Sequence, residues 1–107
     1  MNIGTCNWPI ADGTKVAFSI YDKNEGWNHV AGLYIFAYKT ATGWKAVYVG
    51  QTDDFADRLP DHERINEAGR LGATHIHAKS VDSQAERNRL EVALIQNLQP
   101  PLNTQNR

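Results

Sequence analysis

Glu91 is the residue whose surroundings most favour a chemical role. Leu94, Ile95 and Leu98 follow it at intervals of three, four and seven residues, which places them on its face of a helix. A carboxylate centred on an apolar stripe needs a partner, a proton or a metal ion, because burying it bare is costly. Arg87, four residues earlier, could supply a plain salt bridge. A structural ion pair and a metal ligand therefore both remain open.

Two further pairs of residues have side chains suited to catalysis. Tyr34 and Tyr48 lie in two neighbouring apolar runs, although tyrosines in strands are usually cross-strand packing partners. Arg58 and His62 are four residues apart and share a face if a helix continues through Pro60. An arginine beside a neutral histidine can hold a phosphate and move a proton, whereas most surface arginines and histidines do neither.

Short β-branched and aromatic runs predict the strands that would position these side chains. Residues 33–39 and 44–49 read as a β-hairpin with a glycine-containing loop at 40–43. Residues 15–21 form a possible strand, and the alternating residues within 73–81 suit one more. The order of elements predicts an α+β fold with a small antiparallel sheet, three-stranded or four-stranded, flanked by helices.

Capping residues and prolines predict the helices. Thr52 or Asp53 would cap a helix that Pro60 either kinks or ends, in the second case with Pro60 opening a new helix. That segment should end at Gly69 or Gly72. A capping box over residues 83–86 opens a last helix, which should run to residue 98 or 99 because two prolines follow.

Composition sets limits on the kind of protein. The 107 residues carry a formal net charge of −1, which argues against gripping nucleic acid by bulk electrostatics. Five acidic residues crowd into positions 53–63, around Arg58. The single cysteine, Cys6, favours a reducing, cytoplasmic setting. No apolar run approaches the roughly 20 residues of a membrane helix, and the first residues do not resemble a secretory signal.

Five motifs in the same order resemble the GIY-YIG nuclease superfamily. Gly-Leu-Tyr at residues 32–34 and Tyr-Val-Gly at residues 48–50 are similar to the paired tripeptides that name the superfamily. Arg58 and His62 follow as its helix arginine and a histidine seen in many members. Glu91 opens a segment that resembles the superfamily's ending, with a Leu-Ile pair, prolines and Asn103. The resemblance covers about residues 32–103 and implies a GIY-YIG-like fold.

The resemblance implies metal-dependent hydrolysis of DNA phosphodiester bonds at a single-metal site. Glu91 would hold one Mg²⁺ or Mn²⁺ ion, and a tyrosine, Tyr34 or Tyr48, would deprotonate the attacking water. His62 could assist that tyrosine as a base, and Arg58 would stabilise charge on the phosphate. Asn103 would fix the local geometry.

We therefore expect an endonuclease domain at residues 32–107, preceded by an N-terminal arm at 1–31 that adds one strand. DNA would be bound weakly without help, so a protein partner could supply specificity, and no membrane is involved. The alternative is a non-catalytic adaptor of the same fold that binds nucleic acid or protein, which the acidic residues around Arg58 favour.

Overall fold

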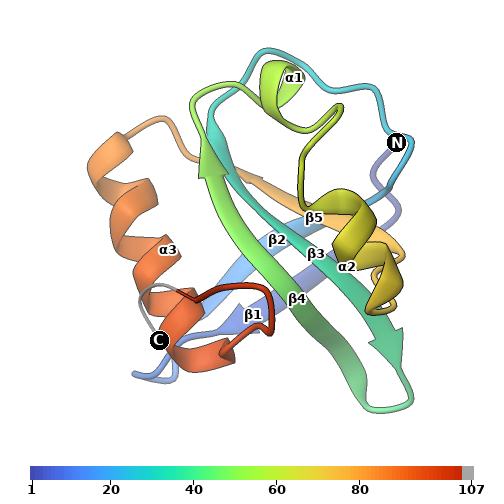
Figure 1. Cartoon of the computed structure of the whole chain (residues 1–107). Coiled ribbons are helices and arrows are strands. Elements are labelled where there is room, and N and C mark those ends of the chain that lie inside the picture. The colour runs from blue at the N-terminus through green and yellow to red at the C-terminus, as the bar shows by residue number, and fades with distance from the viewer. Residues whose placement is uncertain (105–107) are drawn as a thin grey trace.

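The computed structural model describes residues 1–104 and shows an α+β fold with one sheet and three helices (Figure 1). The strands are β1 (Thr5–Pro9), β2 (Lys15–Asp22), β3 (Gly32–Thr40), β4 (Gly43–Thr52) and β5 (His75–Ser80). The helices are α1 (Phe55–Arg58), α2 (Ile65–Arg70) and α3 (Gln84–Leu98).

The sheet has five antiparallel strands in the order β1-β2-β5-β3-β4, so the expectation of three or four was too low. The N-terminal segment 1–31 contributes two strands rather than one. Strand β1 escaped prediction because it is short and ends in Pro9, which demotes a strand assignment. Since β2 pairs with β5, this segment continues the same sheet. Residues 105–107 of the expected 32–107 domain lie outside the described part.

Helices cover both faces of the sheet. Helix α3 packs Leu90, Leu94 and Ile95 against one face. The α1–α2 segment covers β3 and β4 on the other face, where Phe55 and Leu59 are buried beside Tyr34. The alternation of side chains along β3 therefore sends Tyr34 toward α1 and its neighbours toward α3.

The segment around Pro60 differs from both expected arrangements. Asp54, rather than Thr52 or Asp53, caps α1 by accepting the backbone N–H groups of residues 56 and 57. Helix α1 ends at Arg58, before the proline, and α2 begins only at Ile65. Between them Asp61 adopts a left-handed conformation with φ of 61°, which turns the chain back toward the sheet.

The last helix follows its prediction closely. The Ser83 hydroxyl accepts the backbone N–H of Glu86 at 3.2 Å, and Gln99 ends the helix in the left-handed conformation. Within residues 1–104, none of the helices has the length and apolar character needed to cross a bilayer.

Candidate active site

The two glycines beside the tyrosines allow close packing that a side chain would block. A Cβ at Gly50 would stand 2.5 Å from the hydroxyl of Tyr34, its partner on the neighbouring strand. A Cβ at Gly32 would stand 2.1 Å from the carbonyl oxygen of Lys79. Gly50 therefore lets the Tyr34 ring lie across the edge strand β4, and Gly32 lets β3 and β5 pair beneath α1.

His62 lies directly above the tyrosines although it shares no helix with Arg58. Its ring makes edge-on contacts with Tyr34 at 5.4 Å, Phe36 at 5.1 Å and Tyr48 at 5.6 Å between ring centres. Its Nε2 atom is 2.8 Å from the Tyr34 hydroxyl oxygen. The turn at Asp61, rather than a helical face shared with Arg58, therefore places His62 beside the tyrosines.

The hydrogen bonds of His62 fix which ring nitrogen carries the proton. Its Nδ1 accepts the backbone N–H of Arg64 at 3.0 Å and therefore carries none. Burial and then the Arg58 charge lower the pKa of His62 to about 4, so the ring is neutral near pH 7. The proton is on Nε2, and His62 donates to Tyr34. In this arrangement it is a donor to the tyrosine rather than a base that removes its proton.

Both tyrosines are held protonated by their surroundings. Burial raises the pKa of Tyr34, and the nearby Tyr48 adds to the effect. Burial likewise raises the pKa of Tyr48, whereas the positive charge of Arg58 opposes the rise in both. The negative charge of Glu91 also contributes to raising both pKa values. The Tyr48 hydroxyl has no hydrogen bond to any described residue.

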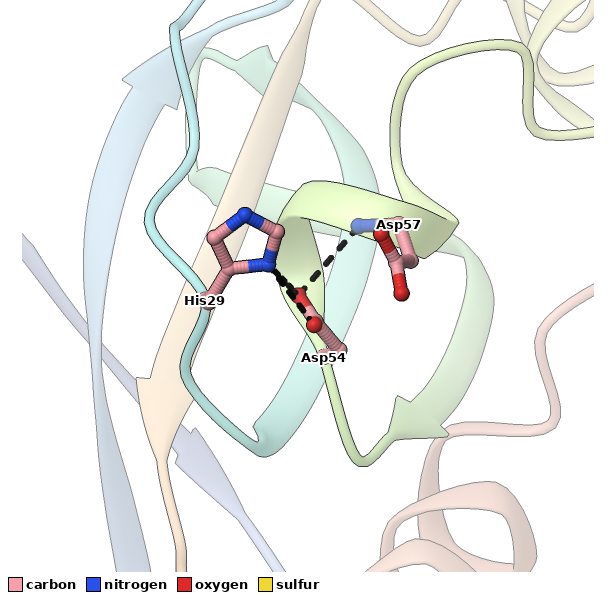
Figure 2. Close-up of side chains that lie close together, drawn as sticks. All are labelled: His29, Asp54 and Asp57. Atoms are coloured by element: carbon pink, nitrogen blue, oxygen red, sulfur yellow. Dashed lines mark hydrogen bonds and ion pairs between the residues drawn. The ribbon is translucent and has the colours of Figure 1, made fainter.

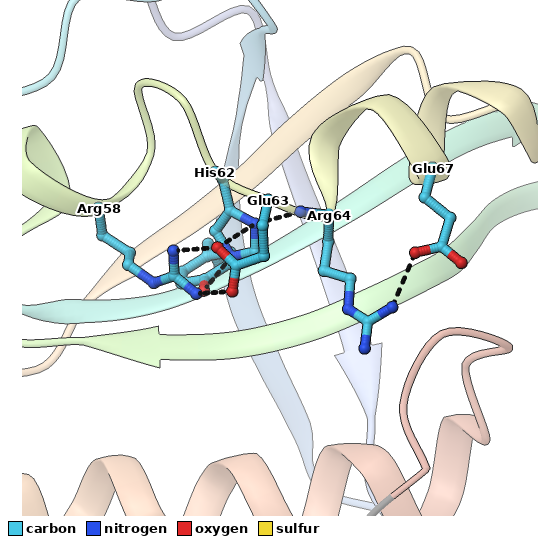
Figure 3. Close-up of polar contacts among 6 residues, drawn as sticks. Arg58, His62, Glu63, Arg64 and Glu67 are labelled. Carbon is cyan, nitrogen blue, oxygen red and sulfur yellow. Dashed lines mark hydrogen bonds and ion pairs between the residues drawn. The ribbon is translucent and has the colours of Figure 1, made fainter.

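Arg58 stands at the open side of this cluster and is held by an acidic neighbour (Figure 3). Its guanidinium donates to both carboxylate oxygens of Glu63, at 2.6 and 2.7 Å. This pairing lowers the pKa of Glu63 to about 2 and raises that of Arg58. A second pair, Arg64 with Glu67 at 2.7 Å, lies farther along the same segment.

Glu91 lies at the margin of the apolar stripe rather than at its centre. The core-facing residues of α3 are Leu90 and Leu94, and one further residue rotates the helix by about 100°. Glu91 is consequently half-buried beside the edge strand β4. The alternative salt bridge with Arg87 is absent, because that guanidinium donates to the backbone carbonyls of residues 81 and 82, at 2.9 and 2.8 Å.

Gln51 is the residue of the site that the sequence did not indicate. Its Nε2 donates to Glu91 Oε1 at 3.0 Å and to Asn88 Oδ1 at 2.5 Å, while its Oε1 accepts from Arg87 Nε at 3.3 Å. Gln51 follows Gly50 directly. Gly50 lies against the Tyr34 hydroxyl, and Gln51 binds the Glu91 carboxylate. Neighbouring residues of β4 thus contact both groups. The sequence signal that could have indicated Gln51 is its position immediately after the Tyr-Val-Gly tripeptide.

Asn103 shapes the backbone of the site without reaching it. Fully buried, it accepts the Val49 N–H at 2.8 Å and donates to the Val49 carbonyl at 2.9 Å, as an added strand would. The backbone N–H of Leu102 bonds to the carbonyl of Val47 at 3.1 Å. The outer edge of β4 is thereby fixed next to Gly50.

A second group of possible metal ligands lies at the start of α1 (Figure 2). Ligand atoms of His29, Asp54 and Asp57 all lie within 4.8 Å of one another. The His29 ring is 2.8 Å from a carboxylate oxygen of Asp54, which also caps the helix. The helix cap and the ion pair with His29 already account for Asp54 as a structural residue.

Comparisons with known proteins identify the fold. No family model and no curated protein matches the chain. The magnesium-bound GIY-YIG N-terminal endonuclease domain of UvrC from Thermotoga maritima matches with a TM-score of 0.59 and 24% identity, over 73% of this chain and 88% of that one. Two point mutants of that domain, each bound to a catalytic divalent cation, match with TM-scores of 0.60 and 0.61 and identities of 25% and 24%, over 74% of this chain and 88% of each of theirs.

This chain has the GIY-YIG superfamily fold, and its solved structural neighbours are endonuclease domains bound to a divalent cation.

Proposed function

We propose that the protein is a metal-dependent endonuclease that hydrolyses phosphodiester bonds in DNA. The observation that carries this proposal is the buried 2.8 Å hydrogen bond between His62 and the Tyr34 hydroxyl, which lies against Gly50, next in β4 to the Gln51 that binds Glu91. A purely structural role does not require a histidine, two tyrosines, an arginine and a carboxylate to gather at one sheet edge. Hydrolysis of a phosphodiester uses all of these groups.

The chemistry of Glu91 fits a divalent cation. One of its oxygens accepts from Gln51, and the other has no hydrogen bond to a described residue. Mg²⁺ is commonly held by one or two carboxylates, with water and substrate phosphate as its remaining ligands. We assign Glu91 as the ligand for one Mg²⁺ or Mn²⁺ ion. When bound, this ion would polarise a phosphate oxygen and stabilise the leaving group.

The chain's own residues would handle the proton and the charge on the phosphate. Tyr34 would first give its hydroxyl proton to solvent, a loss that the nearby positive charge of Arg58 favours, and the N–H of His62 would stabilise the resulting phenolate by donating to it. The phenolate would then take the proton of the attacking water. Tyr48, whose hydroxyl has no partner in residues 1–104, is the alternative base. The planar guanidinium of Arg58 stabilises charge on the phosphate oxygens once it releases Glu63.

The proposal extends to a positioning residue, the substrate, the division of the chain and the cellular location. Asn103 is a positioning residue that holds β4 through Val49. DNA is the substrate, and a protein partner supplies specificity because the net charge of −1 gives little affinity for DNA. Residues 1–31 and 32–107 remain the proposed arm and nuclease domain. The cytoplasmic location is still inferred from Cys6.

One observation favours the second candidate, a non-catalytic adaptor. The arginine that would contact phosphate is instead paired with Glu63 in a two-point ion pair. An adaptor needs neither a free guanidinium nor a cation at Glu91. The two functions therefore differ in whether DNA is cut and whether cutting depends on metal.

A supercoiled-plasmid assay separates the two functions. Wild-type protein should nick the plasmid with Mg²⁺ or Mn²⁺ and not with EDTA. Glu91→Gln, which retains size and the contact with Gln51, should abolish nicking. Asp57→Asn is the matched control, since it removes a carboxylate from the other possible metal group. Loss of nicking in Asp57→Asn alone would move the metal to that group, and DNA binding without any cutting would favour the adaptor.

A further inference from the structure

The side-chain amide of Gln51 lies between two oppositely charged residues of α3 that are one helical turn apart. Its oxygen accepts the Nε–H of Arg87 at 3.3 Å, and its nitrogen donates to Glu91 Oε1 at 3.0 Å. Opposite charges four residues apart on a helix often pair directly. Here a side chain from the edge strand β4 separates them, and Glu91 forms no ion pair within residues 1–104.

The backbone before α3 holds Arg87 in place. The arginine is buried, with 5% of its surface exposed. Its Nη1 donates to the carbonyl oxygens of Val81 and Asp82, at 2.9 and 2.8 Å. A buried charge needs partners for its N–H groups, and these carbonyls supply them without a carboxylate. The same contacts leave Nε to donate to Gln51.

The two charged neighbours of Gln51 specify one orientation of its amide. A guanidinium has only donors and an ionised carboxylate only acceptors, so the amide oxygen faces Arg87 and the NH₂ group faces Glu91. The third partner, Asn88, is exposed and could offer either end of its own amide. Without Arg87, the half-buried Gln51 side chain would lose its only buried partner and regain freedom to rotate.

This arrangement leaves Glu91 with one oxygen for a cation. Oε1 accepts from Gln51, so Oε2 is the atom that remains. Mg²⁺ is usually bound through one or two carboxylates, with waters completing its octahedron. Hydrogen bonds from supporting residues orient such a ligand before the ion arrives. A fixed carboxylate with one oxygen already occupied therefore suits binding of the ion through a single atom.

We propose that Arg87 is a positioning residue of the metal site, which holds the Gln51 amide against Glu91 and thereby orients the carboxylate for one cation. This inference rests on the proposed metal-dependent function and extends the site to a buried residue that does not touch Glu91. The charge of Arg87 alone acts in the opposite direction, because it repels a cation. Loss of Arg87 should therefore weaken cation binding only through the loss of its contact with Gln51.

The test measures binding of Mn²⁺ to the chain without DNA, from the electron paramagnetic resonance signal of the free ion. Arg87→Met removes the guanidinium and should weaken Mn²⁺ binding about tenfold, the lower end of the usual effect of losing a residue that supports a metal ligand. Arg89→Met is the matched control. It removes an exposed arginine of the same helix, which is paired with Glu86, and should bind Mn²⁺ as the wild type does.

A double variant separates positioning from a general effect on the fold. Because Arg87 acts through Gln51, Arg87→Met should cause no further loss of Mn²⁺ binding in a chain that already carries Gln51→Leu. A merely structural role would lower the affinity by the same factor in both backgrounds. Circular dichroism establishes that each variant is folded.

A second variant serves if Arg87→Met does not fold. Arg87→Lys keeps the buried charge and a donor for the carbonyls of residues 81 and 82, but it lacks the separate Nε donor. It should also bind Mn²⁺ about tenfold more weakly than the wild type, and only when Gln51 is present.

The outcomes distinguish this inference from the proposed function. A folded Arg87 variant that binds Mn²⁺ as tightly as the wild type, or that loses the same factor with and without Gln51, overturns the positioning role and leaves Glu91 as the ligand. Glu91→Gln tests the site itself. If that variant binds Mn²⁺ as the wild type does, the assigned ligand and this inference fall together.

Discussion

The guanidinium of Arg58 and the carboxylate of Glu63 form a two-point ion pair, with hydrogen bonds of 2.6 and 2.7 Å. The proposed mechanism needs that guanidinium for phosphate. A phosphodiester must therefore compete with Glu63 for the same N–H groups. Because the Glu63 side chain is 64% exposed, water can replace it readily when the arginine turns to DNA.

Glu63→Gln should strengthen DNA binding and raise the rate of nicking. Removing the competing charge frees Arg58, and the gain should be about two- to fivefold, as expected for an exposed ion pair. Glu67→Gln is the matched control, since it breaks the Arg64 pair in the same segment. Filter binding and plasmid nicking at fixed salt measure the effect. A fall in rate with Glu63→Gln alone would instead make Glu63 a residue that orients Arg58.

Gly50→Ala should be strongly destabilising and should abolish activity. The added methyl group would meet the Tyr34 ring and hydroxyl at 2.5 Å, and the ring is buried. We expect a loss of about 1–3 kcal/mol in the free energy of unfolding, as for overpacked cores. Urea denaturation checks this, with Gly26→Ala as the control because nothing lies within 4 Å of its Cβ position. Equal stability of the two variants would contradict the close packing of Tyr34 on β4.

Gln51→Leu should weaken metal binding more than it changes the reaction at saturating metal. Gln51 orients the Glu91 carboxylate, and loss of such a supporting hydrogen bond typically costs about 10- to 100-fold in metal affinity. The Mg²⁺ concentration that gives half-maximal nicking measures the effect. Asn88→Ala, which removes the other acceptor of the same amide group, should have little effect. An unchanged Mg²⁺ requirement in Gln51→Leu would remove Glu91 from the metal site.

Stability should fall as the pH is lowered from about 6.5 toward 4.5. Burial holds the pKa values of His62 and His77 at about 4, below the ordinary histidine value of 6.5. The unfolded chain therefore binds more protons in this range, and the free energy of unfolding decreases as the pH falls. Urea midpoints at pH 7.0, 6.0 and 5.0 should decrease in order.

A variant isolates the contribution of one histidine to this pH dependence. His77 accepts the indole N–H of Trp8 at 3.0 Å and, as the register partner of Ile35, lies on the α3 face, opposite to that of Tyr34. His77→Gln should flatten the dependence between pH 6.5 and 4.5 without changing nicking at pH 7.5. An unchanged slope would assign the whole effect to other groups.

The hairpin and the last helix could be predicted because local signals specify them. The loop at 40–43 contains a glycine, and Ser83 caps α3 as its sequence pattern indicated. Strand β1 has no comparable local signal, since its place depends on pairing with β2. The five-stranded sheet is a tertiary outcome that alternating residues alone do not determine.

The candidate site likewise has a part that could be predicted from the sequence and a part that could not. The paired tripeptides, Arg58 and Glu91 could be found from their order along the chain, but the partners of each could not. The ion pair with Glu63 and the amide link through Gln51 depend on how α1 ends and where α3 meets β4. The proton on His62 Nε2 is determined by a backbone N–H two residues later, a contact that exists only once the turn at Asp61 has formed.

The two edges of the sheet differ in a way that affects assembly. Asn103 and Leu102 occupy outward hydrogen-bonding groups of Val47 and Val49 in β4, so that part of the edge is closed to further strands. Within residues 1–104, the opposite edge strand β1 pairs only with β2. A partner that extended the sheet would therefore add at β1, four strands away from β4. The chain could be joined to other proteins through its sheet without obstructing access to DNA.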